Sequence, residues 1–393
     1  MGTFIMVVYG KGYRFDLGRG KPQFSGTGLL VATSNPNGAQ VFINGNLTTA
    51  TDNTINLSPG TYTVKIFKEG YFSWEKNIKI QKEVVAKAEA LLLPTAPKLE
   101  NITASGVENP SLDPSKTRIA YTVSSQSVRK NGVYVLDMSN RPILTLQSAS
   151  VQIADNTTDL FSQALLSWSP DGTSIVATIS GNLNLPTTYI LKANGFNEFP
   201  QNVTATLPSF QSDWQNEQEE KEKSRIQALK APLQKMISQN FKIIAWSPDE
   251  TKILYEASVS ATLPLIIKPR LIGFDSTPEE RSIKESSIYA YDILEDKNYK
   301  ILDSILNFQL SPARGGINFQ LPLSWFPDSK HFVYVNDKKI NIIEYDGTNS
   351  TTIYAGPFVD NYVFSWPNGS KIVILTNLNN TNIEPNLYTI GLK

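Results

Sequence analysis

Side chains that commonly carry out chemistry are sparse in this sequence. It has no cysteine and a single histidine, His331, which directly follows a turn and opens an apolar run, so we interpret it as a strand-edge residue. One histidine without cysteine does not supply the usual ligand sets of zinc sites. Disulfides and thiol catalysis are excluded, and the Gly-x-Ser-x-Gly elbow of a serine hydrolase does not occur. We therefore predict no catalytic, cofactor-binding or metal-binding residues, and no cofactor.

The carboxylates leave one enzymatic alternative open. Asp171, Asp249 and Asp328 recur at turn positions, where aspartate bonds its own backbone. Glutamates cluster at 217–222 and 279–280, which is typical of solvated faces. Glycoside hydrolysis, however, needs only two carboxylates at a suitable separation in space, and linear spacing does not test that. A glycosidase or lyase acting on surface polysaccharide remains the alternative to a protein without catalysis.

The three aspartates belong to a phrase that recurs over the C-terminal three-quarters of the chain, with weaker copies at 111–115 and 365–369. An apolar-Ser-Trp segment enters a Pro-Asp-Gly-like corner and leaves as a β-branched run, which predicts a hairpin. Self-similarity at about 40–45 residues with strand-only content is typical of β-propeller blades. The corner residues to which we assign this structural role are Trp168, Pro170, Asp171, Gly172, Trp246, Pro248, Asp249, Trp325, Pro327, Asp328, Trp366, Pro367, Asn368 and Gly369.

The spacing of the corners predicts five blades, with six as the alternative. Trp325 and Trp366 are one blade apart in sequence, whereas the other intervals between corner tryptophans are nearly twice as long. The last blade lacks one strand before the C-terminus, and a strand from about 99–108 would complete it. We attribute the long intervals to insertions.

Two insertions are expected. Apolar residues at helical spacings predict an amphipathic helical insertion at about 212–240, bent near Pro232. It either packs on the propeller rim or docks a partner. A second insertion, at about 258–286, is predicted to be a long loop, and long ordered loops on rigid scaffolds often bind ligands.

Residues 26–95 predict a separate small β-sandwich. Short alternating strands are divided by glycine and proline corners, and Asn44-Gly45 is a strong hairpin signal. The segment Ser34 to Gly45, followed by Leu57 to Tyr62 and Glu69 to Tyr71, resembles a PEGA domain. That resemblance implies an extracytoplasmic or surface-associated β-module without known catalysis.

Two departures from the PEGA pattern leave its fold implication intact. Asn37 replaces the glutamate of the Pro-Glu-Gly-Ala turn, and residues 48–54 lack the usual Thr-Pro. The glycines and the strand pattern are kept. The corner phrase in turn resembles the Tol-type "W-S-P-D-G" propeller repeats of bacterial periplasmic and surface proteins.

Residues 1–25 are expected to hold an apolar segment and a linker. The apolar run 3–9 is too short for a membrane helix, which needs about 20 residues. It fits either a buried strand or the trailing end of a truncated membrane anchor.

Over the whole chain, the number of lysines plus arginines equals the number of aspartates plus glutamates, so the formal net charge is zero. A nucleic-acid partner is therefore not expected.

These observations predict an all-β protein: a PEGA-like sandwich at 26–95, then a five- or six-bladed propeller at 96–393 with a helical insertion. We expect no enzyme, but an extracytoplasmic scaffold or recognition protein, membrane-anchored or at the cell surface. Its expected partner is a protein or a cell-wall polysaccharide bound through the propeller face and the insertions. Besides the enzyme alternative, a purely structural surface spacer remains open.

Overall fold

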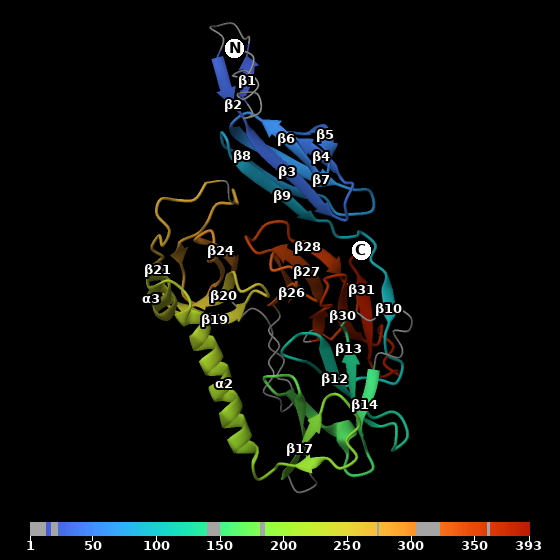
Figure 1. Ribbon diagram of the computed structural model, residues 1–393. Coiled ribbons are helices and arrows are strands. Elements are labelled where there is room, and N and C mark those ends of the chain that lie inside the picture. The colour runs from blue at the N-terminus through green and yellow to red at the C-terminus, as the bar shows by residue number, and fades with distance from the viewer. Residues whose placement is uncertain are drawn as a thin grey trace.

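The computed structural model describes residues 13–16, 23–139, 150–180, 185–272, 275–303, 323–359 and 362–393. In these residues a β-sandwich leads into a β-propeller, and the sandwich lies beside one edge of the propeller (Figure 1). The apolar run 3–9 lies outside the described residues. Within them, neither helix combines the length and the apolar character that a bilayer crossing requires.

The sandwich consists of two sheets whose facing sides share one hydrophobic core that includes Leu30, Val41 and Ile66. The sheet orders are β6-β3-β9 and β5-β4-β7-β8, and β3 pairs with β9 in parallel. The strands are β3 (Gly28–Asn35), β4 (Gln40–Ile43), β5 (Asn46–Ala50), β6 (Asn53–Leu57), β7 (Gly60–Phe67), β8 (Trp74–Ile80) and β9 (Val85–Leu91). A short hairpin of β1 (Tyr13–Asp16) and β2 (Gln23–Gly26) precedes them.

Five four-stranded antiparallel sheets form the propeller in the described residues. Blade I contains β11 (Glu108–Leu112), β12 (Arg118–Val123), β13 (Gly132–Asp137) and β14 (Ser150–Asp155). Blade II contains β15 (Leu165–Trp168), β16 (Ser174–Ser180), β17 (Pro186–Lys192) and β18 (Gln201–Asn202). Blade III contains β19 (Phe241–Trp246), β20 (Lys252–Ala257), β23 (Ile288–Asp292) and β24 (Lys297–Leu302).

Blades IV and V complete the set. Blade IV contains β25 (Leu323–Trp325), β26 (His331–Asn336), β27 (Lys339–Glu344) and β28 (Thr351–Tyr354). Blade V contains β29 (Val363–Ser365), β30 (Lys371–Thr376), β31 (Asn386–Gly391) and β10 (Leu99–Asn101). Because β10 pairs with β31, a strand from the start of the propeller completes its last blade, as expected. Of the expected range 99–108, only 99–101 form that strand, and Glu108 opens β11 of blade I.

The corner phrase forms the turn between the first two strands of each blade. In all five corners the last turn residue has a positive φ: Lys116 at 59°, Gly172 at 68°, Glu250 at 58°, Ser329 at 59° and Gly369 at 67°. Glycine adopts this conformation without steric cost, whereas other residues are strained in it. The repeated hairpin therefore keeps one backbone geometry even where its sequence has diverged.

The helical insertion forms two helices, α2 (Leu207–Gln227) and α3 (Ala231–Asn240). Only α3 is amphipathic: Leu233, Met236 and Ile237 are buried, whereas α2 buries no residue. The expectation of one amphipathic helix over 212–240 is therefore wrong for α2. Pro232 lies in the first turn of α3, where proline is tolerated, so it begins a helix and does not bend one.

The loop insertion is mostly irregular. A two-stranded sheet of β21 (Ala261–Thr262) and β22 (Ser282–Ile283) closes its base. Between them, the described residues pack against the turn that joins β23 to β24: the backbone N–H groups of Ile266 and Ile267 both donate to Asp296, at 2.7 and 2.8 Å. Residues 273–274 lie outside the described part.

The shared corner geometry predicts the effect of adding a Cβ to a corner. Gly172→Ala would place a Cβ 3.1 Å from the Arg118 guanidinium at a positive φ, so we expect a loss of about 1–2 kcal/mol of unfolding free energy. Gly195→Ala is the control, because nothing lies within 4 Å of its Cβ, and its change should stay within about 0.5 kcal/mol. Equal urea midpoints for the two variants would contradict this account of the corner.

Candidate functional site

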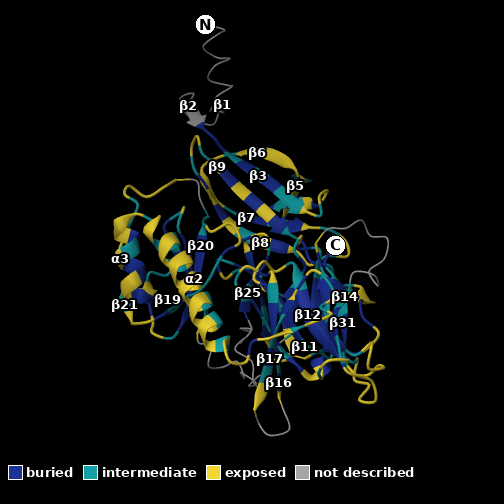
Figure 2. Ribbon diagram, turned by 60° about the horizontal axis from the view of Figure 1, so that its bottom comes forward, coloured by how far each residue is buried: buried dark blue, intermediate teal, exposed yellow. Residues whose placement is uncertain are grey.

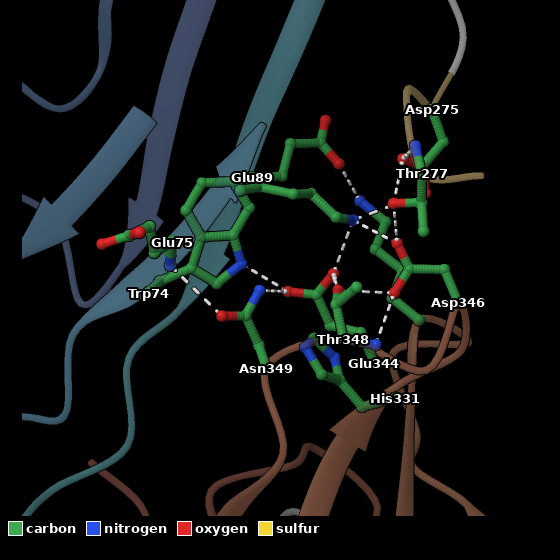
Figure 3. A network of polar contacts seen from close by, with 12 residues as sticks. Trp74, Glu75, Glu89, Asp275, Thr277, His331, Glu344, Asp346, Thr348 and Asn349 are labelled. Atoms are coloured by element: carbon green, nitrogen blue, oxygen red, sulfur yellow. Dashed lines mark hydrogen bonds and ion pairs between the residues drawn. The ribbon is translucent and has the colours of Figure 1, made fainter. Parts of the chain in front are cut away.

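A buried polar network joins the sandwich to blade IV (Figure 3). Lys76 on β8 extends its ammonium group into three carboxylates: it lies 2.8 Å from Glu344, 3.4 Å from Asp275, and in direct contact with Asp346. Glu344 ends β27, Asp346 lies in the following turn, and Asp275 comes from the loop insertion. We call these four residues, together with Trp74, the sandwich–propeller joint.

The alternation of β8 places Lys76 in the joint. Side chains at every second position of a strand point to the same face. Trp74, Ile78 and Ile80 are buried on one face of β8, and Lys76 lies on that same face. Although β8 is the edge strand of its sheet, the side chain of Lys76 is only 13% exposed. A charge buried to this degree requires charged or hydrogen-bonding partners.

Further hydrogen bonds surround the central charge. The Trp74 indole N–H donates to Glu344, and Asn349 donates to the same carboxylate at 2.9 Å. The backbone N–H of Glu75 donates to Asn349 at 3.2 Å, which ties the strand itself to the turn after β27. Glu344 is therefore bound from both domains at once.

Apolar packing continues the joint toward blade V. Leu93, which follows β9, is buried in one hydrophobic cluster with Phe326 of blade IV and with Ile390 and Leu392 of blade V. Lys330, in the blade IV corner, also forms an exposed ion pair with Glu89 of β9. Because the chain runs from Leu93 directly to β10 of blade V, the two domains are held together by packing, charge and chain connectivity.

The pKa values of the two aspartates in the joint are shifted in opposite directions. Burial and the neighbouring Asp346 raise the pKa of Asp275 above its usual value, although Lys76 opposes the shift. Burial also acts to raise the pKa of Asp346, but Lys76 and hydrogen bonds from Asp275 and Thr277 outweigh it, so that this pKa is lowered. Burial disfavours the ammonium of Lys76, yet the three carboxylates raise its pKa overall. The network thus favours an ion pair between Lys76 and Asp346.

A further carboxylate, from blade III, contacts the backbone of Asp275. Glu295, in the turn between β23 and β24, accepts the backbone N–H of Asp275 and lies 3.7 Å from Lys297. Burial, followed by repulsion from Asp292, raises the pKa of Glu295 to about 7 from a usual value of 4.5.

The chemistry available to the joint is that of an ionic clamp. Its carboxylates converge, but the ammonium of Lys76 occupies the point of convergence. In the described ranges, no group of three histidine, cysteine, aspartate or glutamate side chains is arranged to hold a metal ion.

The corner residues chosen from sequence are spread around the propeller and do not form one site. Trp168, Trp325 and Trp366 are buried, while Asp171, Asp249, Asp328 and Asn368 are exposed. Each of these exposed side chains accepts a backbone N–H two residues ahead, as in Thr173 to Asp171 at 2.9 Å. The prolines Pro170, Pro248, Pro327 and Pro367 lie in the same turns, followed by Gly172 or Gly369 where the corner keeps its glycine.

His331 opens β26, as expected, and its ring bonds the corner of its own blade. Its Nδ1 lies 2.6 Å from Asp328, whose side chain is 33% exposed. Partial burial acts to raise the pKa of Asp328, but the contact with His331 outweighs it, so that this pKa is lowered. The one histidine is therefore engaged in supporting a turn.

Sequence reasoning did not identify the joint. One signal was available: Lys76 interrupts the apolar positions of an otherwise alternating strand. The partners Asp275, Glu344 and Asp346 carry no comparable signal, because each resembles an ordinary loop or turn residue in the sequence.

Comparison with known proteins bears on the sandwich first. Residues 27–95 match the family model of the PEGA domain. This match covers less than half of the chain and agrees with the sandwich as a separate unit. The comparison with curated proteins returns no match.

Solved structures similar to this chain include three propellers. The putative TolB from Agrobacterium tumefaciens is 12% identical over 72% of this chain and 78% of its own, with a TM-score of 0.22. TolB from Acinetobacter baumannii is 15% identical over 84% and 59%, with a TM-score of 0.23. The β-propeller domain of the trilobed protease from Pyrococcus furiosus is 13% identical over 93% and 96%, with a TM-score of 0.22. The propeller assignment itself rests on the five sheets described above.

Removing the central charge should weaken the joint strongly. Lys76→Met leaves three buried carboxylates without their cation, so we expect a loss of about 3–5 kcal/mol of unfolding free energy. Lys79→Met, on an exposed position of the same strand, should change it by less than about 0.5 kcal/mol. Urea unfolding monitored by tryptophan fluorescence measures both; equal losses would show that the lysine network does not stabilise the fold.

Glu295 predicts a specific pH dependence. Because its folded pKa of about 7 exceeds the usual 4.5, its contribution to stability falls as pH rises through this window. Glu295→Gln mimics the protonated form, so its stability advantage over the parent should be near zero at pH 4, grow between about 4.5 and 7, and level off above. Melting temperatures across pH 4–9 test this, with exposed Glu285→Gln as the control. A constant difference between Glu295→Gln and the parent would refute the assignment.

Proposed function

We propose that this protein is a non-catalytic, envelope-associated scaffold or recognition protein that binds a partner through its propeller. The PEGA match supports an extracytoplasmic, surface-associated module at residues 27–95. The observation that carries the proposal is the sandwich–propeller joint, which makes the two domains one body. Such a body suits the presentation of a propeller surface at a fixed orientation to its neighbours.

Blade II offers the surface for the partner. In the turn between β17 and β18, Phe196 is 50% exposed and Phe199 is 91% exposed. The turn is nevertheless well held: Asn197 accepts the N–H of Lys192 at 2.9 Å and donates to the carbonyl of Ile153 in blade I, also at 2.9 Å. An ordered turn that exposes two aromatic rings is typical of a protein-binding element, because exposed apolar area favours burial against a partner.

The location of this turn agrees with a binding role. Blade II lies at the end of the molecule away from the sandwich, where β17 is labelled in Figure 1. A partner bound there meets no obstruction from the sandwich. We expect a protein partner, and a cell-wall polysaccharide is the second possibility, because exposed aromatic rings also stack on sugars.

The glycosidase alternative is weakened by the joint. In the described part of the chain, Asp275, Glu344 and Asp346 converge, but the single ammonium of Lys76 pairs with all three and the sandwich covers them. General acid–base hydrolysis requires a carboxyl pair that faces the glycosidic bond.

Photo-crosslinking in native envelopes tests the binding surface. A benzophenone amino acid replacing Phe199 should yield a discrete crosslinked species, whereas the same replacement of Phe72 in the sandwich, which is 39% exposed, should not yield that species. Identical crosslinks to abundant neighbours from both positions would favour a structural spacer. Recovery of the whole protein in the cytosolic fraction would contradict the envelope assignment.

A further inference from the structure

Corner tryptophans bond from one blade to the blade before it. The indole N–H of Trp168, in blade II, donates to the carbonyl of Ser111 in β11 of blade I at 3.0 Å. The indole N–H of Trp325, in blade IV, donates to the carbonyl of Ala245 in β19 of blade III at 3.3 Å. In both cases the acceptor lies on the first strand of the preceding blade, so the repeat carries a built-in contact between neighbours.

Trp246 of blade III breaks this pattern. Its indole N–H donates to the two carboxylate oxygens of Glu222 on α2, at 2.9 and 3.0 Å, and not to a backbone carbonyl of blade II. One helical turn further, the Arg225 guanidinium lies 6.0 Å from the centroid of the Trp246 ring and 2.6 Å from Glu250 in the blade III corner. Trp246 is also only partly buried, in contrast to Trp168 and Trp325.

Hydrophobic packing breaks at the same place. In the described part of the chain, core clusters join blades V and I, I and II, III and IV, and IV and V. The fifth hydrophobic cluster of the propeller combines residues of blade III with residues of the two insertions, and it contains no residue of blade II. It includes Leu233 and Ile237 of α3 and, at the end of α2 and just beyond, Ile226 and Leu229. We call the boundary between blades II and III the seam.

The other end of α2 is attached to blade II. Directly before the helix, the backbone N–H of Val203 donates to the carbonyl of Thr188 in β17 at 2.8 Å. The N–H of Thr188 donates to Thr204 at 2.9 Å, and that of Leu207 donates back to Val203 at 2.8 Å. A helix of 21 residues spans about 30 Å, and this one runs from blade II to blade III with no buried residue between its ends (Figures 1 and 2).

We propose that α2 is a strap that closes the propeller across the seam, with Glu222 and Arg225 as its catch on Trp246. The helix takes over the contact that the preceding blade makes at Trp168 and Trp325. Because the strap holds blade III by one charged hydrogen-bonded cluster and a small apolar patch, the seam is the boundary at which the ring opens first. Partial opening of the propeller therefore separates blade II from blade III and leaves the other four boundaries closed.

Hydrogen exchange followed by mass spectrometry tests the strap in the intact protein. In Glu222→Ala/Arg225→Ala, amides of β15 and β19, the first strands of the two blades at the seam, should exchange about tenfold faster or more. Amides of β25 and β29 should keep their rates. Trp246→Phe, which keeps an aromatic ring but removes the indole N–H together with part of the ring area, should shift the same amides in the same direction.

The matched control is Glu220→Ala/Lys223→Ala, which removes an exposed ion pair of 3.5 Å from the same helix without touching Trp246. It should leave exchange in β15 and β19 unchanged. Three results would overturn the proposal: unchanged rates in both catch variants, equal acceleration in all five blades, or the same acceleration in the control. Glu222→Gln, which retains an acceptor for the indole, should recover most of the protection.

Discussion

The arrangement of this protein depends on burying one ammonium group among three carboxylates. Taking such charges out of water costs several kcal/mol per ion, and their attraction offsets this only when geometry and hydrogen bonding are good. Here Lys76 comes from the sandwich, and its partners come from blade IV and the loop insertion. Separating the domains would leave charges without partners on both surfaces. The cost of that separation opposes any independent motion of the sandwich.

The same network holds Asp275 of the irregular loop insertion in place. Asp275 belongs to an insertion that carries little regular structure, yet it bonds the sandwich through Lys76 and blade III through the turn at Glu295. The loop therefore contacts both the sandwich and blade III at the joint. The two insertions of the propeller have comparable roles, because each links elements that the blades do not link themselves: the loop joins the sandwich to blade III, and α2 joins blade II to blade III.

The sequence predicts most of the fold because the corner phrase encodes a local structure. Turn chemistry at Pro170-Asp171-Gly172 needs no distant information, and the buried indoles provide the packing between blades. The strand that completes blade V was predictable because the residues around the last corner predict one strand fewer than a blade requires. In the sandwich, the Asn44-Gly45 hairpin was visible for the same local reason.

The contacts that make the molecule one body could not be predicted in this way. Lys76 and Glu344 are far apart in sequence, and nothing local distinguishes Glu344 from an ordinary strand-end glutamate. The parallel pairing of β3 with β9 likewise follows from tertiary closure. The sequence predicts an amphipathic α2 only when its apolar residues are taken together with those of α3. In the structure α3 packs an apolar face on blade III, and α2 adds Ile226 at its end. Periodicity identifies a helix, but not whether a surface exists for it to cover.

Domain alignment by NMR tests the central claim, a single rigid body, most directly. Since the chain has no cysteine, one cysteine introduced at exposed Lys87 would carry a lanthanide tag on the sandwich alone. If the joint holds, residual dipolar couplings from the propeller and the sandwich will fit one alignment tensor of equal magnitude. Propeller couplings reduced severalfold relative to those of the sandwich would show that the domains move independently and would contradict the joint.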